Sequence, residues 1–288
     1  MRLLPGHADV FMKKIILWAA AAFFVRTAGA EIPAATIRTP SGAVWRLVWN
    51  DEFDYTGLPD PARWNYDTSG NDCGWGNNEL QHYTVARRKN VGVRDGLLTI
   101  TARREPQGGK RYTSARLVTR GLHTWRYGRV EARVRFPEGR GTWSAVWLMP
   151  AESRYGEWPA SGEIDLVEQV GYDSECIVGT VHTTRHSHLD GTQKSGNVRS
   201  PDVTRNFHRY AIEWETDEIR FYFDEQLYFT YVNDGTGPES WPFDQPFYVI
   251  VNLAVGGNWG GQRGIDDGVF PQRMEVDYVR VYEKAEAE

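Results

Sequence analysis

Apolar and charged residues alternate strictly in several short segments of this chain, and this pattern constrains the fold more than any other feature. Within residues 128–136, Val130, Ala132, Val134 and Phe136 occupy one parity, and charged residues occupy the other. Successive side chains of a β-strand point to opposite faces, so this segment predicts a half-buried strand. Similar patterns predict further strands at 97–103, 144–149, 177–182, 208–215, 218–223, 227–231, 247–255 and 275–282.

Turn residues separate these segments, and no long helical pattern follows residue 30. Asp95-Gly96 is a typical turn dipeptide, and residues 224–226 predict a tight hairpin between two strands. Short strands joined by turns indicate an all-β sandwich of two antiparallel sheets. Residues 31–288 are enough for one such domain with a sizeable core.

The N-terminal segment has the composition of a secretory signal peptide. Two lysines precede the apolar run 15–25, and small residues at 28–30 fit a cleavage site. Met12, just before the lysines, is a candidate for the true start. The apolar run is too short to span a bilayer. We therefore expect residues 1–30 to be removed from a secreted or periplasmic protein.

The overall composition narrows the possible partners. A formal net charge of −5 argues against nucleic acid or an anionic membrane as the partner. The 12 tryptophans suggest aromatic side chains in an exposed groove as well as in the core. Cys73 and Cys176 are compatible with a disulfide or with two free thiols, and no cysteine–histidine pattern indicates zinc. We expect a monomer without a membrane span.

Three carboxylates fall within residues 161–168, Ser-Gly-Glu-Ile-Asp-Leu-Val-Glu. On a strand, Glu163 and Asp165 share a face, whereas Glu168 would point to the opposite face. One extra residue, a β-bulge near 166–167, would return Glu168 to the same face. Converging carboxylates raise each other's pKa values, which suits the acid and the nucleophile of glycoside hydrolysis. The alternative is a solvated edge strand that carries three acids.

A longer segment carries a resemblance to a known family. Residues 158–168, Trp-Pro-Ala-Ser-Gly-Glu-Ile-Asp-Leu-Val-Glu, resemble the active-site signature of glycoside hydrolase family 16. The bulged form is similar to the laminarinase branch, the endo-β-1,3-glucanases. One departure is the segment 183–188, Thr-Thr-Arg-His-Ser-His, where laminarinases usually carry a glycine-rich segment. Further matching blocks lie at 49–53, 76–81, 127–133, 179–182, 252–259 and 276–282.

The resemblance implies a fold, an activity and catalytic roles. The fold would be a β-jelly roll with a concave substrate cleft, and the activity that of a secreted, retaining endo-β-1,3-glucanase. Glu163 would be the nucleophile and Glu168 the acid/base, with Asp165 hydrogen-bonded between them and no cofactor needed for catalysis. Two alternatives stay open. One is the same chemistry on mixed-linkage β-1,3-1,4-glucan or a marine galactan. The other is a non-catalytic glucan-recognition module, although such modules typically lack one or both glutamates.

The resemblance also implies binding residues. Trp143 and Trp158 would line the glycone side of the cleft, and His182 would hydrogen-bond near Glu168. For each aromatic residue the alternative is packing in the core or in a loop. The full set of implied polysaccharide-binding residues is Asn78, Glu79, Trp143, Trp147, Trp158, His182 and Trp259.

A structural Ca²⁺ on the convex face is a further implication of the resemblance. Its ligands would be the backbone carbonyls of Glu52 and Gly96 and the side chain of Asp277. Calcium prefers oxygen ligands of this kind. The alternative for Asp277 is a solvated strand residue.

Overall fold

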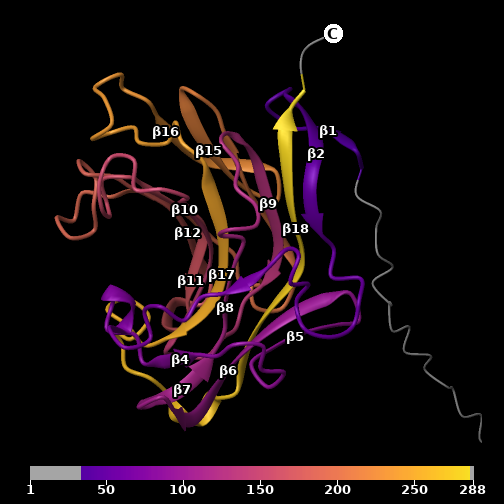
Figure 1. The fold of residues 1–288 in the computed structure, drawn as a ribbon, viewed down its shortest axis with the longest axis vertical. Helices are drawn as coiled ribbons and strands as arrows, with labels where there is room; N and C mark the ends of the chain where they lie inside the picture. Colours follow the sequence, from indigo (N-terminus) through magenta and orange to yellow (C-terminus); the bar gives the residue numbers. More distant parts are fainter. Residues whose placement is uncertain (1–33, 286–288) are drawn as a thin grey trace, which may run out of the picture.

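Strands of two sheets make up most of the computed structural model, which describes residues 34–285 (Figure 1). The predicted signal peptide and the candidate start at Met12 lie outside the described residues. Between residues 34 and 285 the sheets stack as a jelly-roll sandwich, which agrees with the predicted all-β class. No helix in this range is long and apolar enough to cross a membrane.

The larger sheet has eleven strands and forms one layer of the sandwich. Its strands are β1 (Thr36–Arg38), β2 (Val44–Asp51), β4 (Gln81–Tyr83), β5 (Val91–Arg94), β6 (Leu97–Gln107), β7 (Lys110–Ser114), β9 (Gly128–Arg135), β14 (His208–Trp214), β15 (Glu218–Phe223), β16 (Gln226–Val232) and β18 (Gln272–Lys284). The order is β16-β15-β14-β9-β18-β6-β7-β4, with β2 pairing both β1 and β18, and β5 pairing β6. All pairs are antiparallel except β4 with β7.

The second sheet has seven strands and carries the candidate site. Its strands are β3 (Asn65–Tyr66), β8 (Arg116–Val118), β10 (Thr142–Pro150), β11 (Glu163–Val170), β12 (Cys176–His182), β13 (Lys194–Arg199) and β17 (Phe247–Val255), in the order β13-β12-β11-β10-β17-β8-β3. Three short 3-10 helices complete the described chain: η1 (Gly74–Gly76), η2 (Gly171–Asp173) and η3 (Asp267–Val269). Every strand predicted from the alternating segments is present.

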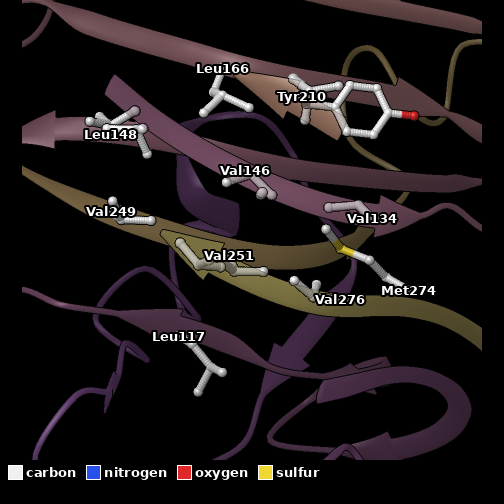
Figure 2. Packing of buried hydrophobic residues seen from close by; sticks show 14 of the residues in the cluster. Leu117, Val134, Val146, Leu148, Leu166, Tyr210, Val249, Val251, Met274 and Val276 are labelled. Carbon is white, nitrogen blue, oxygen red and sulfur yellow. The ribbon is translucent and has the colours of Figure 1, made fainter. Parts of the chain in front are cut away.

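The hydrophobic core fills the space between the two sheets (Figure 2). Val146 of β10 and Val251 of β17 belong to the seven-stranded sheet, and Val134 of β9 and Val276 of β18 belong to the larger one. All four side chains are completely buried. Burying an aliphatic side chain of this kind contributes about 1.5–3 kcal/mol. Because side chains alternate along a strand, the residues on either side of Val146 and Val251 point to the outer face of their sheet.

The hairpin between β15 and β16 is as tight as the sequence predicts. Asp224 and Glu225 form its two-residue loop, with φ values of 46° and 68°. Positive φ at both central residues is the geometry of a type I′ turn, whose twist matches that of the flanking strands.

The first half of the charged face of β9 differs from the prediction of a half-buried strand, whereas Arg133 and Arg135 in the second half are partly exposed as predicted. Arg129 is 0% exposed and Glu131 is 3% exposed. The Arg129 Nη2 group donates to Glu131 Oε2 at 2.6 Å and to Glu225 Oε1 at 2.8 Å, and Nη1 donates to Glu213 Oε1 at 3.4 Å. The prediction was wrong for these two residues because β9 lies between β14 and β18, and acids from β14 and from the β15–β16 turn neutralise Arg129.

Neither cysteine forms a disulfide. Cys73 lies just before η1 and is exposed, whereas Cys176 begins β12 and is half-buried, and both thiols are free. Packing between the sheets therefore holds the described part of the chain together without a covalent cross-link.

Candidate active site

A β-bulge in β11 brings its three carboxylates to one face. Asp165 pairs with Thr180 of β12, and Glu168 pairs with Val178, so three steps along β11 match two steps along β12. The extra residue falls at 166–167, where both side chains are buried. The bulge predicted from the spacing is therefore confirmed, and the carboxylates lie on the outer face of the seven-stranded sheet.

Gly162 forms the sharp entry into β11. Its φ is +84°, a conformation that side chains rarely adopt. An added Cβ would also lie 2.8 Å from Cγ of Pro242 and 2.9 Å from Cε1 of Phe243. Only glycine satisfies both conditions, and the chain can therefore turn immediately before Glu163, the first residue of β11.

Cross-strand register aligns a row of residues across this outer face. Glu168 pairs with Ala145 of β10, Ala145 with Asn252 of β17, and Asn252 with Arg116 of β8. Ala145 has the smallest side chain in the row and separates the carboxyl group from the amide. Because directly paired residues share a face, an extended ligand that crosses the strands can contact the whole row.

Glu163 is held by an indole and lies beside an imidazole. The Trp158 Nε1 group donates to Glu163 Oε2 at 2.6 Å. His182, the last residue of β12, pairs with Glu163 of β11. Its Nε2 atom lies 3.9 Å from Glu163 Oε1 and 3.3 Å from Asp165 Oδ2. The Glu163 side chain is 16% exposed, which leaves it accessible to a ligand.

Burial raises the pKa of Asp165 well above its usual range, and the charge of Glu163 and a hydrogen bond to Glu163 act in the same direction. Burial also raises the pKa of Glu168 well above its usual range. The negative charge of Asp165, once it ionises, adds to this shift, whereas the Trp143 Nε1 donor, 2.9 Å from Glu168 Oε1, opposes it. Asp165 and Glu168 therefore retain protons to a higher pH than isolated carboxyl groups.

Two of the predicted aromatic binding residues contact the carboxylates directly. Trp143 donates to Glu168, and Trp158 donates to Glu163. Trp259 packs edge-on against Trp143, with 5.6 Å between ring centroids. The sequence suggested sugar platforms at these positions but not the two hydrogen bonds, because the position of a tryptophan in the sequence does not reveal where its N–H points.

Trp147 belongs to a second cluster, which includes two residues that sequence reasoning missed. Its Nε1 group donates to Asn252 Oδ1 at 2.7 Å. The Arg116 guanidinium lies 4.7 Å from the Trp147 ring centroid and 4.3 Å from that of Trp75. Asn252 had a usable signal, since it is a polar residue inside the apolar run 247–255. Arg116 had none.

Asn78 and Glu79 occupy different environments. Asn78 is exposed, donates to Asn258 Oδ1 at 2.8 Å, and lines a surface pocket of about 330 Å³. Glu79 is only 6% exposed, and burial raises its pKa to about 6. The Tyr83 hydroxyl lies 3.5 Å from Glu79 and accepts a hydrogen bond from Asn252 at 3.1 Å. The structure therefore places Glu79 beneath the surface, where it contacts Tyr83, the residue that accepts the hydrogen bond from Asn252.

Glu163, Asp165 and His182 are the described residues that satisfy a simple geometric test for a metal site. They offer ligand atoms that all lie within 4.8 Å of one another. A cation at this position would occupy the Glu163 carboxylate, which is partly exposed to a ligand. The arrangement therefore suits acid–base and nucleophilic chemistry better than metal binding.

The residues predicted to bind calcium lie near one another by topology. β18 pairs with β6 through its first residues and with β2 through its last, which brings the turn at Gly96 and the end of β2 at Glu52 toward Asp277. The Asp277 carboxylate pairs with Arg133, and Arg280 Nη2 donates to Glu52 Oε2 at 2.7 Å. A cation at this position would compete with Arg133 for the Asp277 carboxylate.

Comparison with known proteins identifies the family of this chain. The family model for glycosyl hydrolases family 16 matches residues 78–280. A β-glucanase of Rhodothermus marinus is 54% identical over 252 residues, which cover 85% of this chain and 87% of that protein.

Solved structures agree with this relationship. The X-ray structure of the laminarinase from Rhodothermus marinus superposes with a TM-score of 0.82 at 53% identity, covering 84% of this chain and 98% of that one. SCLam, a non-specific endo-β-1,3(4)-glucanase, superposes with a TM-score of 0.80 at 43% identity, covering 88% of this chain and 94% of that one.

Proposed function

Because this chain belongs to glycosyl hydrolase family 16, we propose that it is a retaining endo-β-1,3-glucanase that cleaves laminarin-like polysaccharides. One observation carries the proposal. The bulge in β11 presents Glu163 and Glu168 on one face, with burial keeping a proton on Glu168. An accessible carboxylate next to a protonated one is the pair that retaining glycoside hydrolysis requires.

In the first step, Glu163 attacks the anomeric carbon and Glu168 protonates the leaving oxygen. A bond forms between a Glu163 carboxylate oxygen and the sugar, while the bond from the anomeric carbon to the leaving sugar breaks. The Trp158 N–H fixes the orientation of Glu163. Burial raises the pKa of Asp165 and so favours its protonated form, and in that form Asp165 donates to Glu163.

In the second step, Glu168 is a carboxylate and accepts a proton from water. The water oxygen bonds to the anomeric carbon, and the ester bond to Glu163 breaks, which returns both side chains to their starting protonation. Two displacements on the same carbon restore its configuration. None of these steps requires a metal ion or an organic cofactor.

The row across the sheet supports an internal mode of cleavage. Asn252 and Arg116 continue the line of Glu168 toward one edge of the sheet, and His182 lies on the other side of β11. Binding groups on both sides of the carboxylates suit a polymer that extends in both directions. We therefore expect products of several lengths early in the reaction.

Proton NMR of the first product anomer from laminarin tests the mechanism directly. Retention predicts that the β-anomer appears first and mutarotates later, so an initial α-anomer would refute the assignment of the two glutamates. Chromatography of the early products tests the mode, and glucose as the sole early product would exclude endo cleavage. Activity on agarose or carrageenan without activity on laminarin would refute the proposed β-1,3-glucan substrate. It would not contradict the proposed roles of Glu163 and Glu168.

Mixed-linkage β-1,3-1,4-glucan is the second candidate substrate. It is favoured by the similarity to SCLam, which is described as a non-specific endo-β-1,3(4)-glucanase. Comparing initial rates on laminarin and on barley β-glucan separates the two, because a strict β-1,3-glucanase releases reducing ends much faster from laminarin.

We further propose that residues 1–30 direct export to the periplasm or the medium, and that residues 31–288 act as a monomeric catalytic domain with a Ca²⁺ ion near Glu52, Gly96 and Asp277. The support is the signal-like composition of the N-terminal segment and the pairing of β18, which carries Asp277, with the two strands next to Glu52 and Gly96. N-terminal sequencing of the exported protein and light scattering test the first two points.

A further inference from the structure

A chain of hydrogen bonds runs beneath the substrate face from Trp147 to Glu79. The Trp147 Nε1 group donates to Asn252 Oδ1 at 2.7 Å. The Asn252 Nδ2 group donates to the Tyr83 hydroxyl at 3.1 Å, and that hydroxyl donates to Glu79 Oε2 at 3.5 Å. Tyr83 is completely buried, and Glu79 and Asn252 are 6% and 5% exposed, so bulk water hardly competes for these bonds.

The first member of this chain fixes the direction of every bond in it. An indole N–H can only donate, so the Asn252 oxygen must face Trp147 and the Asn252 NH₂ group must face Tyr83. The Tyr83 oxygen therefore accepts, and its own proton is directed to Glu79. Burial raises the pKa of Tyr83 well above its usual range, so the hydroxyl keeps that proton. Each bond in such a chain polarises the next one.

Gln81 brings a second donor to the same carboxyl oxygen. The Val255 N–H donates to Gln81 Oε1 at 2.8 Å, so the Gln81 NH₂ group must face Glu79. Gln81 Nε2 donates to Glu79 Oε2 at 2.6 Å. Glu79 Oε2 therefore accepts from two sides, and an ionised carboxylate is a stronger acceptor than a neutral carboxyl group.

Glu79 is the member of this environment whose charge changes near neutral pH. Burial raises its pKa to about 6, against the charge of Arg116 on β8, which favours the ionised form. Lys110 Nζ of β7 donates to the Glu79 backbone carbonyl at 3.4 Å. Asp67 lies 3.5 Å from Arg116 Nε, and hydrogen bonds from Ser69 and the charge of Arg116 lower its pKa although burial opposes them.

The other end of the chain lies on the face that carries the catalytic carboxylates. Trp147 and Ala145 have the same parity on β10, and Ala145 pairs with Glu168 on one side and with Asn252 on the other. The Trp147 ring is half-buried and stacks with Arg116. A buried carboxyl group is thus linked by hydrogen bonds to an aromatic ring on the substrate face.

We propose that Glu79 is a positioning residue that holds Trp147 in place through Tyr83 and Asn252, and that glucan binding weakens when Glu79 takes up a proton. The second part rests on the proposed function, which supplies the β-1,3-glucan. Ionised Glu79 strengthens each bond of the chain, whereas neutral Glu79 holds the Trp147 ring less firmly. Glu79 acts from beneath the surface and touches no sugar.

The NMR resonance of the Trp147 indole proton tests the chain without any substrate. The resonance is assigned by its loss in Trp147→Phe. In wild type it should move downfield as the pH rises through about 6, because a stronger hydrogen bond deshields the proton. In Glu79→Gln, which keeps a neutral acceptor of similar shape, it should stay at its low-pH position. The indole protons of Trp143 and Trp158 donate to other carboxylates and should titrate equally in both proteins.

A Trp147 resonance that does not move in wild type, or that titrates identically in Glu79→Gln, would overturn the proposal. Tyr83→Phe tests the route, because it removes the hydroxyl between Asn252 and Glu79 and leaves the Gln81 donor in place. The titration of the Trp147 resonance should vanish in this variant, and its persistence would show that Glu79 does not act through Tyr83.

Calorimetry with laminarihexaose measures the consequence for binding, in a Glu163→Gln background that prevents turnover. Protonation of Glu79 should raise Kd roughly two- to fivefold, since the chain transmits part of the difference between a charged and a neutral hydrogen bond. Glu79→Gln should hold Kd at the weaker value at high pH, and should have no further effect once Trp147→Phe is present. A Kd profile that Glu79→Gln leaves unchanged would overturn the second part of the proposal.

Failure of the proposed function gives a different result. Laminarihexaose that is neither bound nor cleaved would refute the β-1,3-glucanase assignment, while the Trp147 resonance would still decide whether Glu79 positions that ring. The calorimetry is then made with an oligosaccharide of the polymer that the wild type cleaves, and the same outcomes apply.

Discussion

The Trp143 N–H lowers the pKa of Glu168 against the larger effect of burial, so substitution of Trp143 predicts a defined change in the pH–rate profile. Trp143→Phe removes the N–H that donates to Glu168 Oε1 at 2.9 Å and retains an aromatic ring beside Trp259. Glu168 must be protonated for the first step, so activity is lost as the pH rises through its pKa. The donor stabilises the ionised form and lowers this pKa, although burial outweighs it. Without the donor the alkaline limb should move to higher pH.

The size of the shift follows from the hydrogen bond itself. A hydrogen bond to an ionised group contributes about 1.5–3 kcal/mol, and one to a neutral group about 0.5–1.5 kcal/mol. The midpoints of these two ranges differ by about 1.25 kcal/mol, which corresponds to roughly one pH unit. The maximal rate should fall at the same time, because the carboxyl group also loses the contact that orients it.

The assay is kcat/KM for laminarin as a function of pH, which reports the free enzyme. Trp147→Phe is the matched control, since its N–H donates to Asn252 rather than to a carboxylate. It should weaken binding and leave the alkaline limb in place. An alkaline limb that stays fixed in Trp143→Phe, or that moves to lower pH, would show that this hydrogen bond does not set the protonation of Glu168. An equal shift in both variants would show the same.

The remaining predictions concern the carboxylates and calcium. Glu163→Gln and Glu168→Gln should each reduce laminarin turnover by about a hundredfold or more with folding intact. An aryl glycoside should partly restore the first step in Glu168→Gln, because its leaving group needs less protonation. More than a tenth of wild-type turnover in either variant would contradict the proposed catalytic roles of the two glutamates. Asp165→Asn keeps a neutral donor to Glu163, so the fall in turnover should be smaller than for the two glutamate variants. Because Asn never ionises to raise the Glu168 pKa, the alkaline limb should move to lower pH. An unchanged pH–rate profile would make Asp165 purely structural. Chelation should lower the melting temperature by roughly 5–10 °C, since a ligand at 100 times its Kd adds about 2.7 kcal/mol; identical melting curves with chelator and with excess calcium would remove the calcium proposal near Asp277.

Local sequence was sufficient for the strands and for the bulge. Alternation with a period of two is imposed on each strand separately, so it can be detected in residues 128–136 without knowledge of any neighbour. The spacing of Asp165 and Glu168 likewise required an extra residue for the two to share a face, and register with β12 places that residue at 166–167. Both predictions depend only on covalent neighbours.

The same alternation failed for charge burial. Arg129 and Glu131 have the parity and polarity of a solvated face, yet they are buried. Their burial depends on Glu213 and Glu225, which are distant in the sequence and become neighbours only when β9 pairs with β14 and β14 pairs with β15. A single strand's pattern cannot distinguish charges exposed to water from charges neutralised by the next strand.

The sequence by itself determined the strand pattern, the bulged carboxylate motif and the family resemblance. Tertiary structure decided which carboxyl groups keep their protons and what holds them, because burial and donor direction depend on strand register. The row from Glu168 to Arg116 joins residues whose separation in the chain carries no periodic signal. The ring centroid of His188 lies 5.1 Å from that of Trp158, a contact between segments that no local pattern encodes. Proton affinity and substrate contact therefore depend on residues from several strands, and no single segment of the sequence contains all of them.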